Sequence, residues 1–425
     1  MVMICFAVIL LVLLATSGSL GFVLLPLERR GVTGDEAEGR SLAEQVVAAR
    51  LHRPELESYL STTVALGSGP EREFELIVDT GSSLTYVPCT NCKKCGKHMA
   101  RAKFSAEESN TARSVRCKHH RRADCQCGNV HCQCSHNQCY YEIRYAEGSA
   151  SGGKLLSDVV RLGPRNSTLR GKVTFGCSTT ESGLIYSQKA DGILGLSRSK
   201  LSLINQLGEG SGAFSVCPAK ATGVLAVGRI DEDWDWVKSS CLGGKRISVP
   251  YVRSRRGRKH LHGVPLKGLH VGPLSSHNPR KQGSYTMIID TGSTFSYVPP
   301  GLHSVLTEQL EKALAPLAGV KVQGGPPLRT TCFTGSKAGE ELSLSDFPPM
   351  RLVFPNATMT LGPNAYLYQG RGSGPAPRKA FCLLLSKGKG NEVHLGSIML
   401  ENFLVEFDRR EVKFMPCDCS RLLMM

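Results

Sequence analysis

The stretch Phe74-Glu-Leu-Ile-Val-Asp79-Thr-Gly-Ser-Ser-Leu-Thr-Tyr86-Val-Pro88 occurs a second time as Tyr285-Thr-Met-Ile-Ile-Asp290-Thr-Gly-Ser-Thr-Phe-Ser-Tyr297-Val-Pro299. The two copies are identical at eight of fifteen positions and align without a gap. About 110 residues after each aspartate comes a short element that ends in Gly, Ile193-Leu194-Gly195 in the first half and His394-Leu395-Gly396 in the second. A repeat on this scale indicates two halves of similar plan, related by duplication.

The repeated Asp-Thr-Gly-Ser tetrapeptide carries chemistry because a carboxylate appears at the end of a hydrophobic strand. The glycines Gly81 and Gly292 allow a tight turn there, and neighbouring hydroxyls can hold the carboxylate by hydrogen bonds. If the two copies meet across a two-fold axis, Asp79 and Asp290 come into contact. Two carboxylates this close cannot both ionise, so the pair shares one proton. The ionised member can then deprotonate a water while the protonated member donates to a carbonyl oxygen.

The rest of the chain predicts a mostly β protein with minor helices. Short apolar runs are broken by Gly, Pro, Asn and Ser, and helical periodicity is rare. The expected strands include residues 59–66, 74–78, 172–175, 224–227 and 350–354. The expected helices are residues 201–207 and 302–314, and a further helical stretch at 41–51 follows a capping box formed by Ser41 and Glu44.

The N-terminus is almost wholly apolar from Met1 to Leu27 and has small residues at 15–19. It predicts a secretory signal peptide over residues 1–21. Because the segment has no Lys or Arg before its apolar core and nearly reaches the length of a membrane span, an uncleaved signal anchor is the alternative. Residues 22–57 are interpreted as a propeptide or linker, 58–244 as an N-terminal lobe and 245–425 as a C-terminal lobe.

The 425-residue chain has a formal net charge of +16 and 41% hydrophobic residues, a globular composition. Its basic residues lie in short scattered clusters such as 253–259, and no nucleic-acid fold signature is present. We interpret these clusters as solvated loops, with docking to a polyanion as the alternative. No nucleic-acid partner is expected.

The cysteine content also favours the secretory route. Of 17 cysteines, Cys5 lies in the apolar N-terminal segment, and the other sixteen form an even set. Nine of them crowd into an insertion at 89–139 together with His119, His120, His131 and His136, so zinc binding is an alternative to disulfides. Because nine is odd, at least one insertion cysteine must pair outside the segment or stay free. The disulfide candidates are Cys89, Cys92, Cys95, Cys117, Cys125, Cys127, Cys132, Cys134, Cys139, Cys177, Cys217, Cys241, Cys332, Cys382, Cys417 and Cys419.

On these motifs the chain resembles the pepsin-like aspartic peptidases, and more closely their plant and algal nepenthesin/nucellin-like branch, over roughly residues 58–419. The resemblance implies a bilobal fold of two related β-barrel-like lobes with a cleft between them. It implies that Asp79 and Asp290 are the catalytic aspartates of an endopeptidase with an acidic optimum. The supporting residues that it implies are Thr80, Gly81 and Ser82 in the first loop and Thr291, Gly292 and Ser293 in the second.

The resemblance also implies a flap hairpin that closes over substrate, carrying Tyr145, Gly148 and Ser149. Ala146 stands where the family usually has Gly. Ile193, Leu194 and Gly195 match the element packed behind the first active loop, and Leu395 and Gly396 match its counterpart. Ser397 follows Gly396 where the family often has Asp.

The branch carries a Cys-rich insertion before the flap, which supports disulfides over zinc, and it implies a Cys332–Cys382 bridge in the second lobe. The expected partners are protein or peptide substrates, with no cofactor and no metal, and the expected state is a monomer. The expected location is the secretory pathway, ending in the extracellular space, the cell wall or the vacuole, with a membrane tether only if the N-terminal segment is uncleaved. Asn166 and Asn356 are glycosylation candidates. The competing functions are a catalytically weak family member that acts as a binding or inhibitor protein, and an additional metal- or glycan-binding role of the insertion.

Overall fold

The computed structural model describes residues 23–31 and 58–421, apart from internal gaps at 70–71, 97, 99–102, 119–121, 164–168, 208–211, 221, 231–234, 242–244, 253–258, 273–283, 318–319, 324–329, 336–340 and 372–378. The predicted signal peptide, the helix expected at 41–51 and the sequon Asn166 lie outside the described residues. Within the described part, no helix is both long and apolar enough to cross a membrane.

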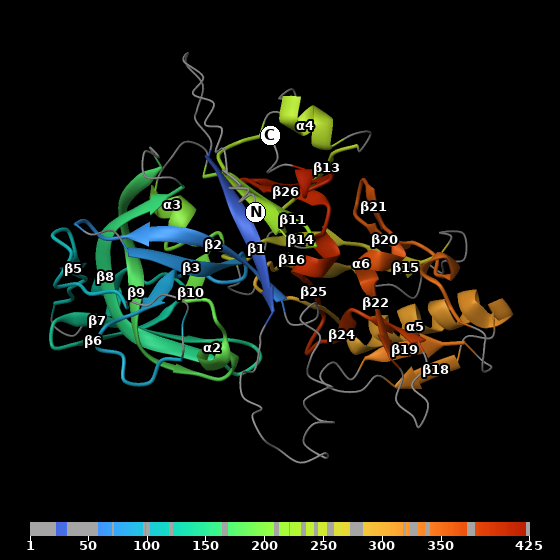
Figure 1. Cartoon of the computed structure of the whole chain (residues 1–425), viewed down its shortest axis with the longest axis horizontal. Coiled ribbons are helices and arrows are strands. Elements are labelled where there is room, and N and C mark those ends of the chain that lie inside the picture. The colour runs from blue at the N-terminus through green and yellow to red at the C-terminus, as the bar shows by residue number, and fades with distance from the viewer. Residues whose placement is uncertain are drawn as a thin grey trace, which may run out of the picture.

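The chain folds into two halves that lie side by side, with strands from both running between them (Figure 1). The first half contains β1 (Val23–Gly31), β2 (Ser58–Leu66), β3 (Arg72–Asp79), β4 (Tyr86–Pro88), β5 (Arg113–Ser114), η1 (Arg122–Cys125), β6 (His131–Ser135), β7 (Gln138–Arg144), β8 (Ala150–Leu162), β9 (Arg170–Ser182), α2 (Leu184–Ser187), β10 (Gly192–Gly195), α3 (Leu203–Leu207), β11 (Phe214–Pro218), β12 (Thr222–Val227) and α4 (Asp235–Ser240).

The second half begins with β13 (Ile247–Pro250), which pairs with a strand near the C-terminus. It continues with β14 (Gly263–Leu266), β15 (Gly268–Val271), β16 (Tyr285–Ile289), β17 (Ser296–Val298), α5 (Pro300–Leu314), η4 (Ala315–Leu317), β18 (Val320–Gln323), β19 (Thr331–Thr334), η5 (Leu344–Asp346), β20 (Met350–Val353), β21 (Thr358–Leu361), α6 (Pro363–Tyr366), β22 (Leu367–Arg371), β23 (Lys379–Leu383), β24 (Leu385–Lys387), β25 (Glu392–Leu395), η6 (Ser397–Leu400), β26 (Phe403–Phe407) and β27 (Glu411–Pro416).

One large sheet joins the two halves. Along part of it, the order β13-β27-β26-β11-β12-β1-β2-β3 takes strands from both ends of the chain. Strand β1, from the segment interpreted as propeptide or linker, lies between β12 and β2 and is antiparallel to both. The lobes are therefore connected by a continuous β-layer rather than by a single linker.

The duplication read from the sequence appears as two matching sets of strands. In the first half β10 runs parallel to β3, and Gly195 is in register with Asp79. In the second half β25 runs parallel to β16, and Leu395 is in register with Ile289. Both repeated Asp-Thr-Gly loops are thus held against the short Gly-ending elements, and the bilobal, mostly β prediction is confirmed.

Most strand and helix predictions are also confirmed. The expected strands at 59–66, 74–78, 172–175, 224–227 and 350–354 correspond to β2, β3, β9, β12 and β20, and the two expected helices correspond to α3 and α5. A continuous apolar core covers both halves and includes the stacked rings of Phe214 and Phe407, whose centroids are 4.8 Å apart. This aromatic pair links β11 of the first half to β26 of the second.

Candidate active site

The two repeated loops are locked together by their threonines. The Thr80 hydroxyl donates to the carbonyl of Ile289, 2.9 Å away, and the Thr291 hydroxyl donates to the carbonyl of Val78, 2.7 Å away. Each hydroxyl also accepts the other threonine's backbone N–H, at 3.0 and 3.2 Å. All four hydrogen bonds are buried, so water cannot take the place of either partner if one of them is lost. Thr80 and Thr291, expected from the resemblance as supporting residues, thus join the two loops to each other.

The glycines of the two loops show how closely the carboxylates approach. A Cβ atom placed on Gly81 would lie 2.6 Å from Asp290 Oδ1, and one placed on Gly292 would lie 2.5 Å from Asp79 Cγ. Any side chain at either position would overlap the carboxyl group of the opposite lobe. Only glycine allows each loop to pass against the other half's aspartate, so the repeated Gly is required by close approach.

Each carboxylate is oriented by its own loop. Asp79 Oδ1 accepts the backbone N–H of Gly81 at 2.7 Å, and Asp290 Oδ1 accepts that of Gly292 at 3.1 Å. The Ser293 hydroxyl donates to Asp290 Oδ2 at 2.8 Å, as expected. The corresponding Ser82 hydroxyl makes no hydrogen bond of standard geometry among the described residues, although its proximity lowers the pKa of Asp79. The two carboxylates are therefore not equivalent.

Burial, and after it the neighbouring Asp290 carboxylate, together raise the pKa of Asp79 from its ordinary 3.8 to about 8. The cause is the one expected for like charges in a shared, dry site, where the pair retains one proton. Because the Asp79 side chain is buried whereas that of Asp290 is partly exposed, we place this proton on the Asp79 side of the pair. The raised pKa therefore keeps a proton on Asp79 at near-neutral and acidic pH, so the pair does not carry two negative charges there.

Comparisons with known proteins agree with this geometry. The family described as "Xylanase inhibitor N-terminal" matches residues 60–229, and "Xylanase inhibitor C-terminal" matches residues 260–415. The chain is 28% identical to "Aspartic proteinase 39" of Arabidopsis thaliana over 378 residues, which is 82% of this chain and 71% of that protein. It is also 28% identical to "Aspartic protease 5" of Toxoplasma gondii over 415 residues, 90% of this chain but 38% of that protein.

The chain belongs to the pepsin-like aspartic peptidase family. Its fold is shared with the crystal structure of basic 7S globulin from soybean, with a TM-score of 0.64 at 18% identity over 95% of this chain and 97% of the other. At that identity the likeness concerns the fold alone. The closer placement in the nepenthesin/nucellin-like branch stays a prediction.

The elements predicted behind the active loops lie there. Leu196, which follows Gly195, donates its backbone N–H to the carbonyl of Asp79 at 2.8 Å. In the second half, the carbonyl of Leu395 accepts the backbone N–H of Asp290 at 3.0 Å. His394, where the first half has an apolar residue, occupies the position equivalent to Ile193 and pairs with Tyr297, as Ile193 pairs with Tyr86.

The hairpin of β7 and β8 carries Tyr145 beside the first aspartate, as expected for a flap. Its turn is closed by the Tyr145 N–H donating to the Ser149 carbonyl at 2.8 Å and by the Gly148 N–H donating to the Tyr145 carbonyl at 3.1 Å. Gly148 adopts a φ of 101°, a conformation that favours glycine. Ala146 has no positive φ, so the turn forms although alanine replaces the glycine that is usual at that position. Burial raises the pKa of Tyr145 well above its ordinary value, and the Asp79 charge raises it further.

Two tyrosines at equivalent positions of the repeat, which the sequence motifs did not mark as site residues, also lie near the flap tyrosine or the aspartate pair. Tyr86 is fully buried, and the charge and proximity of Tyr145 contribute to raising its pKa after burial itself. Tyr297 is 38% exposed, and burial, Glu147 and Asp290 raise its pKa in that order. One copy therefore lies near the flap tyrosine, while the other lies near enough to Glu147 of the flap turn and to Asp290 for both charges to act on it. The identity of both residues within the repeat was the available signal.

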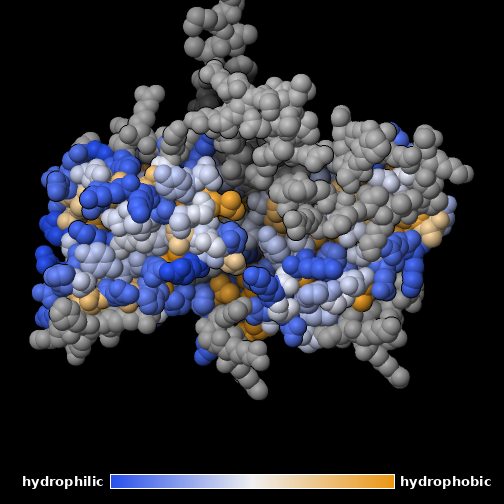
Figure 2. Space-filling model, turned by 90° about the horizontal axis from the view of Figure 1, so that it is seen from below, coloured by the Kyte–Doolittle hydropathy of each residue, from blue (hydrophilic) through white to orange (hydrophobic). Residues whose placement is uncertain are grey.

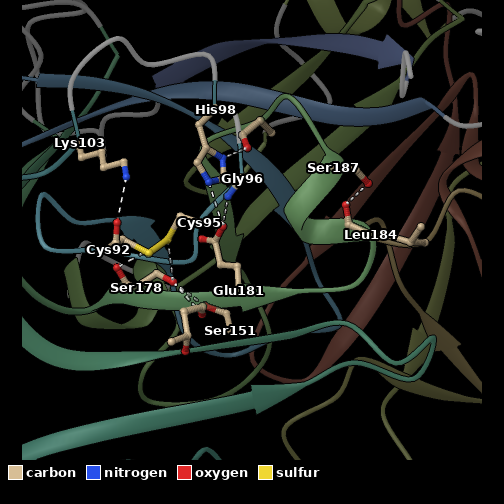
Figure 3. Close-up of polar contacts among 12 residues, drawn as sticks. Cys92, Cys95, Gly96, His98, Lys103, Ser151, Ser178, Glu181, Leu184 and Ser187 are labelled. Atoms are coloured by element: carbon tan, nitrogen blue, oxygen red, sulfur yellow. Dashed lines mark hydrogen bonds and ion pairs between the residues drawn. A yellow bond between two sulfur atoms is a disulfide. The ribbon is translucent and has the colours of Figure 1, made fainter. Parts of the chain in front are cut away.

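The strand beside the flap turn is anchored by a contact that the sequence did not reveal (Figure 3). His98 Nδ1 lies 2.9 Å from the carbonyl of Ala190, and its Nε2 lies 2.9 Å from Glu181 Oε2. Glu181 belongs to β9 and is in register with Ser151 of β8, close to the flap turn. The Cys92–Cys95 loop leading to His98 is thereby attached to the strand that supports the flap.

The sixteen candidate cysteines all pair, in eight disulfides. Four bridges lie within the insertion, and its ninth cysteine, Cys89, bonds Cys177 of β9, which resolves the odd count. Cys332 bonds Cys382, the pair implied by the resemblance. The bridges are Cys89–Cys177, Cys92–Cys95, Cys117–Cys134, Cys125–Cys139, Cys127–Cys132, Cys217–Cys419, Cys241–Cys417 and Cys332–Cys382.

Among the described residues, two groups bring together side chains that could ligate a metal. They are Cys117, Cys125 and Cys139, and Cys95, His98 and Glu181. Every cysteine in both groups is bonded to another cysteine, so it cannot supply the thiolate that zinc prefers. The groups are therefore structural in the oxidised protein, and disulfides rather than zinc organise the insertion.

Proposed function

We propose that the protein is an aspartic endopeptidase that hydrolyses peptide bonds with a water activated between Asp79 and Asp290. The observation that supports it is the close approach of each carboxyl group to the glycine of the opposite loop, together with the effect of the Asp290 carboxyl group on the pKa of Asp79. In this proposal the ionised Asp290 removes a proton from the water. The protonated Asp79 donates to the carbonyl oxygen of the scissile bond. No covalent intermediate with the enzyme is required.

Substrate is expected to bind between the halves, beneath the flap. Viewed from below, the surface is hollowed between them, and hydrophobic residues gather near this boundary on an otherwise largely hydrophilic face (Figure 2). Tyr145 near Asp79 and the partly exposed Tyr297 near Asp290 supply aromatic contacts on the two sides of the pair. Closure of the flap would exclude bulk water from the reacting bond.

The test is a pH–activity profile of the purified full chain on an unstructured protein substrate, with and without pepstatin. We expect pepstatin-sensitive cleavage that is greatest at acidic pH, because the pair must hold one proton. Pepstatin-insensitive cleavage, or none at any pH in a protein that is folded and has its N-terminal segment removed, would overturn the proposal.

The second candidate is a binding protein that inhibits another enzyme, which the description of the matching family, "Xylanase inhibitor", favours. Both Asp-Thr-Gly-Ser motifs are complete here, and the two carboxyl groups meet, which supports the peptidase instead. Adding the purified protein to a xylanase distinguishes the inhibitor from the peptidase. An inhibitor lowers xylanase turnover and does not cleave the protein substrate.

We further propose that the chain is a monomer processed in the secretory pathway and acts outside the cell, in the wall or in the vacuole. The eight disulfides support an oxidising compartment. Asn356, one of the two sequons, is exposed in the turn between β20 and β21, where an oligosaccharide can be attached. The proposed division remains a signal peptide over 1–21, a propeptide or linker over 22–57, and lobes over 58–244 and 245–425. N-terminal sequencing of the active protein tests the first two boundaries.

A further inference from the structure

His262 lies immediately before β14. It is hydrogen-bonded to two backbone segments, one that is itself bonded to Asp79 and one that leads into Asp290. Its ring Nε2 is 2.8 Å from the carbonyl of Leu196, whose own N–H donates to the Asp79 carbonyl at 2.8 Å. Its backbone carbonyl accepts the N–H of Ile289 at 3.1 Å, one residue before Asp290. A single buried residue of the second half therefore connects the supports of the two active loops.

The hydrogen bonds around the ring define its protonation. A backbone carbonyl only accepts, so Nε2 must carry the proton that it shares with Leu196. In a neutral ring Nδ1 is then an acceptor, and the Tyr251 hydroxyl, 2.9 Å away, donates to it. Both ring nitrogens are thus satisfied by a neutral imidazole.

The surroundings favour the neutral form. The rings of Phe407 and Phe214 pack edge-on to His262, with centroids 4.5 and 5.8 Å away. The Arg198 guanidinium lies over the Tyr251 ring, 3.9 Å from its centroid. Burial and, to a smaller extent, the Arg198 charge lower the pKa of His262 to about 3, although the hydrogen bond to Leu196 opposes the shift. The charged groups that act on the ring or on Tyr251 are Arg198, Asp408 and Glu411. The adjoining segments and strands also carry Lys259, His260, Glu406, Arg410 and Lys413.

We propose that His262 is a positioning residue for the peptidase reaction, whose neutral imidazole holds the Leu196 loop and the strand leading into Asp290 in one register. The inference rests on the proposed function and adds a link between the lobes beyond the threonine pair. Its effect is on alignment: if the supports shift, the two carboxyl groups no longer face the same water. Displacements of about 1 Å in such sites lower turnover by about 100-fold.

The experiment compares two substitutions at this position. His262→Gln keeps an N–H donor where Nε2 stands, whereas His262→Phe keeps a planar ring without a donor. We expect kcat to fall about 100-fold in His262→Phe, with KM nearly unchanged, and to stay within about fivefold of the wild type in His262→Gln. His270→Gln, at another buried histidine on β15, is the matched control and should leave kcat unchanged.

A second readout does not depend on activity. A histidine whose pKa is lower in the folded than in the unfolded state makes the protein less stable as the pH falls from its ordinary 6.5 toward about 3. His262→Gln removes this loss, so its urea midpoint should decline less than that of the wild type between pH 6.5 and pH 4. If the wild type has no peptidase activity, the proposed function fails, and the unfolding comparison still tests the neutral, buried state of His262.

Three results would overturn the positioning role. They are full turnover in a folded His262→Phe protein, equal losses in His262→Gln and His262→Phe, and parallel unfolding profiles for His262→Gln and the wild type. If His262→Phe does not fold, Tyr251→Phe takes its place, since it removes only the hydroxyl that donates to Nδ1. We expect this variant to lose about tenfold in kcat, the loss of one hydrogen bond. A Tyr251→Phe protein with wild-type kcat would then count against the proposal.

Discussion

The backbone N–H of Thr291 donates to the hydroxyl oxygen of Thr80, 3.0 Å away, and that hydroxyl donates in turn to the carbonyl of Ile289. One side-chain oxygen from the first half thus satisfies two backbone groups of the second. The Thr291 hydroxyl makes the two equivalent bonds in the other direction: it accepts the Thr80 N–H and donates to the carbonyl of Val78. The lobes are joined at the floor of the aspartate pair by groups that cannot be replaced one at a time without leaving a buried polar atom unpaired.

Thr80→Val should therefore destabilise the protein although the two side chains have the same shape. It leaves the Thr291 N–H and the Ile289 carbonyl without their partner, at a cost of about 1–3 kcal/mol for each buried group. Urea unfolding measures the loss. Thr63→Val, on the exposed face of β2, is the control and should change the midpoint little. Equal midpoints for the two variants would show that the threonine contacts contribute nothing.

Replacing either carboxylate by its amide should remove activity. Asp79→Asn cannot supply the acid and Asp290→Asn cannot supply the base, so kcat should fall at least about 10³-fold in each. Asp191 offers a contrast, because its carboxylate is buried and accepts the Glu75 N–H at 2.8 Å, away from the pair. Asp191→Asn should retain measurable turnover in the fraction that folds. Wild-type turnover in either of the first two variants would mean that the pair has been assigned wrongly.

The proton held by the pair should also appear in the stability of the protein. The pKa of Asp79 is about 8 in the folded state and ordinarily 3.8, so between these values the folded protein keeps a proton that the unfolded chain has released. Stability is then greatest at acidic pH and decreases as the pH rises toward 8. In Asp79→Asn this decrease should be smaller, and the inactive variant should be more stable than the wild type at pH 7.5. Urea midpoints at pH 4.5 and 7.5 check this, and identical pH slopes would contradict it.

The sequence predicted the active loops because their chemistry is local. Asp79 and Asp290 each follow a strand and precede the glycine that the other half approaches, and this pattern is visible in fifteen residues. The disulfides were predicted as a set, but the partners within the insertion were not, since C-x-C spacings allow several pairings. Cys89 bonding Cys177 on β9 depends on the third dimension.

The contacts that support the site were hidden from the sequence because they join distant segments. His262 contacts Leu196 across 66 positions, and His98 contacts Glu181 across 83. Neither histidine belongs to a motif, and a single histidine among apolar residues does not indicate which distant residue it contacts. Tyr86 and Tyr297 could have been found, because they are identical members of the repeat that face different surroundings.

The flap turn provides a matched pair of substitutions. Gly148 has a φ of 101°, which a residue with a Cβ adopts only with strain of about 1–3 kcal/mol. Gly148→Ala should therefore distort the hairpin and lower kcat/KM by about tenfold. Ala146→Gly restores the residue that the family usually has and should change kcat/KM little. Steady-state kinetics on one peptide substrate measures both, and the prediction is wrong if Ala146→Gly has the larger effect.

The His98–Glu181 pair under the flap should respond to pH in the opposite sense to His262. Burial alone lowers the pKa of His98, but the hydrogen bond and charge of Glu181 outweigh it, so the pKa is raised above the ordinary 6.5. Such a histidine stabilises the folded state below pH 6.5, and the contribution is lost as the pH rises through the raised pKa. The Cys92–Cys95 loop should therefore open more readily at pH 8 than at pH 5.

Hydrogen exchange of the Glu181 amide, which donates to the Lys94 carbonyl at 2.7 Å, reports this opening directly. After correction for the intrinsic rate, its protection should decrease between pH 5 and pH 8 in the wild type and should depend less on pH in His98→Gln. His131→Gln, on the exposed face of β6, serves as the control and should behave as the wild type. Since Glu181 pairs with Ser151 of the flap strand, loss of protection there should be accompanied by a rise in KM rather than a fall in kcat. A pH-independent wild type would show that the ion pair does not hold the loop in place.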